Sequence, residues 1–167
     1  ELVMGTGTWT ITGSGATAWN VTSTTNLTIT PGTSTISMSS ASAKTFVGGG
    51  LTWGNLTNSG AGALTITGSN TFATISNSVQ PTTITFPSST TTTVSGLSIS
   101  GTAGNLVTLQ SSTSGTQFTI SKSSGTVTTS YAAIKDSAAT GGATWNASST
   151  SGNVNNGNNT GWSFAAV

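Results

Sequence analysis

Apolar residues recur about every nine positions through the first two-thirds of the chain, and alternate members of this series form two columns. The spacing within each column is 18 or 19 positions. A fixed period of this kind predicts a coil of short strands in which each turn stacks on the one before it. Ten residues are therefore predicted to point into the core: Ile11, Ile29, Val47, Ile66 and Ile84 in one column, and Trp19, Met38, Leu56, Ile75 and Val94 in the other.

The segments 8–12, 26–30, 63–68 and 82–86 alternate apolar residues with threonine, which is the pattern of strands with one buried face. Glycine, asparagine and proline separate these segments and suit tight corners. The sequence therefore predicts an all-β fold, a parallel β-helix (β-solenoid) with a right-handed coil and a turn of about 18 to 19 positions. Residues 1–130 are predicted to form the coils. Residues 131–167 are predicted to cap the same domain, with Trp145, Trp162 and Phe164 covering the apolar end of the last turn.

Charged residues make up 3% of the chain, and the net charge is +1. The 38 threonines and 28 serines among the 167 residues supply the polar surface instead. Equivalent positions in successive turns lie about 4.8 Å apart, so columns of like charge would repel, whereas hydroxyl columns can form hydrogen bonds. So few charged residues give no positively charged surface that would bind nucleic acid or an anionic membrane. No apolar run reaches the length of a membrane span, and no cysteine is present.

The side chains that usually carry catalysis are rare in this sequence. Histidine, cysteine and arginine are absent, and the only acids are Glu1 and Asp136. Neither a nucleophile with a histidine base nor a pair of catalytic carboxylates can be assembled, and repeated metal ligands are lacking. The sequence therefore predicts a protein that is not an enzyme and has no metal and no cofactor. The adjacent Lys135 and Asp136 are expected in a solvated or locally paired turn.

One outward pattern has two interpretations. Flat files of threonine on a solenoid resemble the face that solenoid ice-binding proteins use. Threonine is also an ordinary outward residue of strands, and the third turn interrupts the files near Val47. The pattern places eight residues on the outward face: Thr10, Thr12, Thr28, Thr30, Thr65, Thr67, Thr83 and Thr85.

Residues 44–164 resemble β-helical modules of bacteriophage tail-fibre and other virion structural proteins, and related repeats of bacterial surface proteins. The more specific motifs are Gly-Gly-x-x-Trp ending at Trp53 and Gly-Asn-Asn-x-Gly-Trp ending at Trp162. Further matching segments are residues 64–72, 104–109, 115–118 and 134–145. The resemblance implies no catalytic residues. An acid expected before the asparagine-rich ending is replaced here by Asn155.

Together these features predict a non-enzymatic structural protein, a rigid shaft or surface module of a phage fibre or extracellular filament. We expect it on a virion surface or outside the cell. Homo-oligomers are expected, as a trimer or an end-to-end filament, with other virion or surface proteins as further partners. The alternative is a binding module for ice or for a surface glycan.

Overall fold

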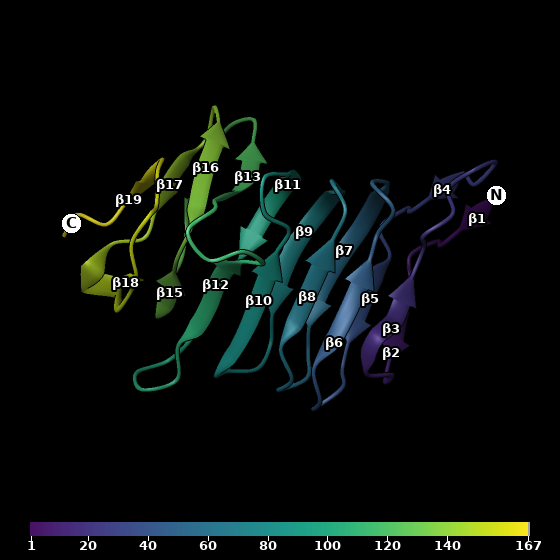
Figure 1. Ribbon diagram of the computed structural model, residues 1–167, viewed down its shortest axis with the longest axis horizontal. Coiled ribbons are helices and arrows are strands. Elements are labelled where there is room, and N and C mark those ends of the chain that lie inside the picture. Colours follow the sequence, from purple (N-terminus) through teal and green to yellow (C-terminus); the bar gives the residue numbers. More distant parts are fainter. Residues whose placement is uncertain (167) are drawn as a thin grey trace.

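The computed structural model describes residues 1–166, which form a stack of short parallel strands with the two chain ends at opposite ends of the stack (Figure 1). Two seven-stranded sheets run along its length, and a two-stranded and a three-stranded sheet complete the coils. Every ladder between named strands is parallel. The predicted β-solenoid is therefore confirmed, with about 6 turns.

Neighbouring strands of each large sheet come from successive turns of the coil. Sheet I contains β3 (Gly15–Asn20), β6 (Lys44–Val47), β8 (Leu64–Thr67), β10 (Thr82–Phe86), β12 (Val107–Ser111), β15 (Ala132–Ile134) and β18 (Val154–Asn155). Sheet II contains β2 (Thr8–Ile11), β5 (Thr35–Met38), β7 (Thr52–Asn58), β9 (Thr71–Asn77), β11 (Thr91–Ser98), β13 (Phe118–Lys122) and β16 (Ser137–Gly141). The smaller sheets pair β1 (Leu2–Val3) with β4 (Ile29–Thr30), and β17 (Thr144–Asn146) with both β14 (Thr126–Thr128) and β19 (Trp162–Ser163). A 3-10 turn covers Ser149–Ser151.

The length of a turn is less regular than the period of the sequence predicts. In sheet I, Leu64 pairs with Lys44 and Ile84, 20 positions away on either side, and Ile84 pairs with Leu109, 25 positions further. In sheet II, Leu56 pairs with Ile75, 19 positions further. The ladder fixes only the paired strands, so the corners between them can hold additional residues without disturbing the stack.

The inner side of sheet I differs from the prediction by one position in β6. Lys44 and Phe46 point into the core, whereas Val47 lies on the outer side and is only half-buried. Phe46 pairs with Ile66, and Val47 pairs with Thr67. Since side chains alternate along a strand, a slip of one residue exchanges the two faces. The resulting inner column is at most 1% exposed and consists of Lys44, Leu64, Ile84, Leu109 and Ile134.

Four residues of the second predicted column lie on the inner side of sheet II, but they occupy different registers. Leu56 and Ile75 pair with each other, but Met38 pairs with Asn58, and Val94 pairs with Phe72. The side chains of Met38, Leu56, Ile75 and Val94 are nevertheless all buried. The apolar spacing therefore indicated the inner face, while the register depends on the pairing of the strands.

The first turn accounts for the remaining predicted core residues. Ile11, Trp19 and Ile29 are only half-buried because no earlier turn covers them among the described residues. Ile29 lies in β4 and pairs with Leu2, outside both large sheets. The indole of Trp19 stacks on Phe46 with 6.0 Å between the ring centroids.

The stack continues past residue 130. Strand β15 pairs with β12, β16 pairs with β13, and β18 pairs with β15. The indole rings of Trp145 and Trp162 meet edge to face, with centroids 5.0 Å apart. Trp145 is buried, and Trp162 and Phe164 are half-buried against the core. The described part of the predicted capping segment thus contributes further turns to the same sheets.

Candidate functional site

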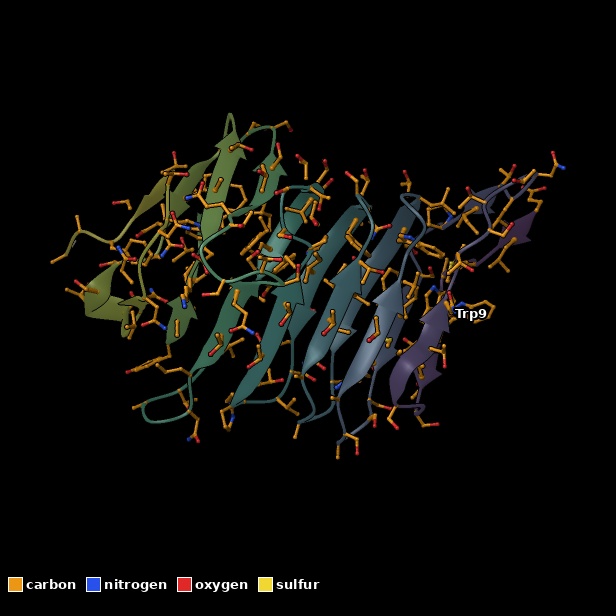
Figure 2. The ribbon with its side chains drawn as sticks, viewed as in Figure 1. Trp9 is labelled. Atoms are coloured by element: carbon orange, nitrogen blue, oxygen red, sulfur yellow. The ribbon has the colours of Figure 1, made fainter. Side chains whose placement is uncertain are left out.

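The N-terminal end of the stack exposes its apolar interior. Trp9 occupies the register of Ile36, which is 1% exposed, but Trp9 itself is 38% exposed. Its side chain lies at the N-terminal end of the molecule (Figure 2). Val3 is 61% exposed close to the same end. A column that is closed in the next turn is therefore open in the first.

The strands at this end also have a free edge. Strands β2 and β3 are the last members of sheets II and I, so within residues 1–166 no strand pairs with their outer edges. Such an edge presents unpaired backbone N–H and C=O groups and can accept another strand. Exposed apolar side chains and unpaired backbone together make this end a candidate interaction surface.

The predicted threonine files do not form as expected on the outer side of sheet I. Thr65 aligns with Thr45 and Thr85, Thr83 aligns with Thr108, and Thr67 aligns with Val47. The ladder pairs Ile84 with Leu64 rather than with Ile66, which shifts each threonine by two positions. An even shift keeps these side chains on the outer side but changes their partners.

The other four predicted threonines lie away from sheet I. Thr10 belongs to β2 of sheet II and pairs with Ser37. Thr12 follows that strand. Thr30 pairs with Val3 in the small N-terminal sheet, and Thr28 lies directly before strand β4 of that sheet. The eight residues therefore do not form one binding face, because the long first turn displaces residues 26–30 from the stack.

Sheet II carries a hydroxyl column that the sequence pattern did not reveal. Thr57 and Ser76 share a hydrogen bond of 2.9 Å between their hydroxyl groups, and Ser37 forms one of 2.6 Å with Ser59. In these bonds the hydroxyl groups pair with neighbouring hydroxyl groups instead of with solvent. The column consists of Thr10, Ser37, Thr57, Ser76 and Ser98.

Lys44 is a buried cation inside sheet I, and its side chain is 1% exposed. Its Nζ donates to three main-chain carbonyl oxygens, those of Gly62 at 2.6 Å, Ser40 at 2.9 Å and Gly60 at 3.3 Å. Burial lowers the pKa of Lys44, while the three acceptors match the three donors of an ammonium group. The side chain thereby joins two successive corners of the coil.

Asp136 is the only acidic side chain within the stack, and it is 2% exposed. Its carboxylate accepts hydrogen bonds from Asn158 Nδ2 at 2.7 Å and from the Gly115 backbone N–H at 3.1 Å. These two bonds and the nearby Lys135 lower the pKa of Asp136, against the opposing effect of burial. Asp136 is therefore neither solvated nor paired only within its own turn, because its carboxylate joins residues from three turns.

We expect this carboxylate to make the stability of the fold dependent on acid pH. Because its pKa is lowered in the folded state, its contribution is complete above the unfolded value of about 3.9 and is lost as the pH falls through the lower folded value. Asp136→Asn should be less stable than the parent at neutral pH and should approach it in acid. Urea unfolding midpoints measured across acid and neutral pH test this. Parallel pH profiles for the two proteins would contradict it.

The part of the chain that the structure describes contains no pocket and no group of three or more potential metal ligands. No helix within residues 1–166 is long and apolar enough to cross a membrane. Among the described residues, the features that could meet a partner include the open end, the neutral outer faces of the sheets, and the outer edge of β18, where Val154 is 39% exposed.

The structure defines the class of protein as a β-solenoid, a fold compatible with a structural module or a binding module. Comparison of the chain with protein-family models, with curated proteins and with solved structures finds no match. The likeness to fibre modules, which rests on sequence motifs, stays a prediction.

Proposed function

We propose that this chain is a non-enzymatic structural module, a rigid shaft or surface module of a phage fibre or extracellular filament, and that it joins other copies end to end. Its place would be a virion surface or the outside of the cell. The observation that carries the proposal is the open N-terminal end, where Trp9 is 38% exposed in a register that is closed in the next turn.

The stack has the physical properties that a shaft requires. Parallel ladders tie each turn to the next, and the inner columns are closed to solvent along most of the length. The outer faces carry short hydroxyl side chains instead of flexible charged ones. Such a surface offers few sites to a protease, because a protease needs exposed, unpaired backbone and most of the backbone here is paired between turns.

The same observations favour an end-to-end contact over a lateral one. Parallel strands offer the same hydrogen-bonding pattern on both edges, so the free edge of β2 and β3 suits a terminal turn of another copy. The contact would be heterologous, and a heterologous contact that does not close produces a filament. The neutral hydroxyl faces lack the contiguous apolar surface that a stable lateral interface uses.

Negative-stain electron microscopy with light scattering tests this proposal, using the parent protein and two variants. Trp9→Glu places a charge on the open end, whereas Thr93→Glu places the same charge on an exposed outer position of β11. The parent and Thr93→Glu should form rods that lengthen with protein concentration. Trp9→Glu should remain a single folded unit, with a thermal melt to confirm its folding.

Other outcomes would overturn the end-to-end contact. If the parent is a monomer at every concentration, the proposal fails, and ice shaping or glycan binding by that monomer would support the binding-module alternative. A trimer that Trp9→Glu leaves intact would show lateral association instead.

A further inference from the structure

We propose that Asn156 is a site of spontaneous deamidation, and that its conversion loosens the last turns of the solenoid. Asn156 precedes Gly157, and this is the only Asn-Gly pair in the sequence. A glycine that follows asparagine has no side chain to hinder its backbone nitrogen. That nitrogen can therefore reach the side-chain carbonyl carbon of the asparagine.

The surroundings of Asn156 leave the reaction path open. Both Asn156 and Gly157 are exposed, and no atom beyond the adjoining residues lies within 4 Å of the place where a Cβ on Gly157 would stand. Within residues 1–166, the side chain of Asn156 forms no hydrogen bond that holds its amide. By contrast, the side-chain amide groups of Asn153, Asn155, Asn158 and Asn159 are all engaged in hydrogen bonds.

The reaction needs only water. The Gly157 nitrogen gives up its proton to solvent and bonds to Cγ of Asn156, the C–N bond of the side-chain amide breaks, and ammonia leaves with a succinimide ring in place. Water then opens the ring at one of its two carbonyls. Opening at the side-chain carbonyl produces aspartate, and opening at the main-chain carbonyl produces isoaspartate. The net change is one asparagine and one water converted into one acid and one ammonia.

One contact slows this reaction in the folded protein. The Gly157 N–H donates to Asn155 Oδ1 at 3.0 Å, which holds the proton that must leave. Asn155 Oδ1 is itself held by Asn159 Nδ2 at 2.7 Å. Asn155 therefore acts as a positioning residue that restrains Gly157, and its removal should accelerate the conversion.

Isoaspartate would disturb the contacts that fasten this loop to the previous turn. The Asn156 N–H donates to Ile134 O at 2.9 Å, and Gly157 O accepts from the Asp136 N–H at 3.1 Å. Isoaspartate inserts an additional main-chain carbon between these two anchors, so both cannot keep their present geometry. Asn158, which follows directly, supplies the 2.7 Å hydrogen bond to the Asp136 carboxylate. The modification also adds a negative charge to a chain whose net charge is +1.

The experiment incubates the purified chain at mildly alkaline pH and physiological temperature. Cleavage after Lys135 with trypsin releases a single peptide that contains Asn156 and five other asparagines as internal controls. Tandem mass spectrometry should locate the change from amide to acid at position 156 before it appears at any other asparagine of that peptide, and mainly as isoaspartate. Asn155→Ala should react about threefold faster than the parent. Asn156→Gln should show no conversion there.

Hydrogen exchange of the modified protein tests whether the conversion of Asn156 loosens the last turns. Faster exchange at Asp136 and Asn156, with unchanged exchange in β8 and β10, is expected. The proposal is overturned if the folded chain keeps its Asn156 amide while the urea-unfolded chain loses it, because the fold then protects the site. Conversion without any change in exchange at Asp136 would overturn the loosening of the last turns.

Discussion

An aspartate in place of Ile66 is expected to prevent the chain from folding. Ile66 is 0% exposed, pairs with Phe46 on the inner side of sheet I and lies within the continuous core. The cation on that side, Lys44, is already held by three main-chain carbonyl oxygens, so an aspartate at position 66 would be a buried charge without a free partner and would leave space where the isoleucine packs. The expected loss of unfolding free energy exceeds about 4 kcal/mol, which is a large part of the stability of an ordinary domain. Circular dichroism and urea unfolding measure it.

The neighbouring position supplies the matched control. Thr67 follows Ile66 in β8 and lies on the outer side, half-buried beside Val47. Thr67→Asp introduces the same charge and should cost no more than about 1 kcal/mol, and Thr67→Ser should be nearly silent. Equal thermal melts for Ile66→Asp and Thr67→Asp would refute the assignment of the two faces of sheet I.

Alanine in place of Lys44 is expected to have the second largest effect, a loss of about 3 to 5 kcal/mol of unfolding free energy. The substitution removes the donor to three carbonyl oxygens, those of Ser40, Gly60 and Gly62, and the buried aliphatic stem with it. Lys44→Met restores the volume of the stem but not the hydrogen bonds. Its stability should therefore lie between those of the parent and of Lys44→Ala. Urea unfolding followed by circular dichroism measures all three.

Lys135→Ala is the control for the removal of a positive charge. The Nζ of Lys135 donates at 3.3 Å to the exposed hydroxyl of Ser114, a contact that stabilises little. This variant should lose less than about 1 kcal/mol. If Lys44→Ala is no less stable than Lys135→Ala, the carbonyl cluster around Lys44 does not stabilise the coil.

The class of fold follows from the amino-acid sequence alone. Alternation of apolar residues with threonine fixes two faces for each strand, and its recurrence fixes stacking, because every turn must bury the same stripe. The pattern also identified inner residues such as Ile66 and Ile75, since burial of an apolar side chain depends on its face and little on its partner. The scarcity of charged groups follows from the same stacking, as like charges would meet in every column.

The register of the strands depends on contacts between turns and could not be predicted from the sequence. Corners of unequal length shift one turn against the next. Thr65 therefore aligns with Thr85 instead of Thr83, and the predicted pair of threonine files does not form. In β6 the inner positions fall on Lys44 and Phe46 rather than on Val47, and carbonyl oxygens from two successive corners accept hydrogen bonds from Lys44. Asp136 likewise became a buried anchor through Gly115 and Asn158. These placements depend on which backbone groups lie next to each other between turns, and a local sequence pattern does not specify those contacts.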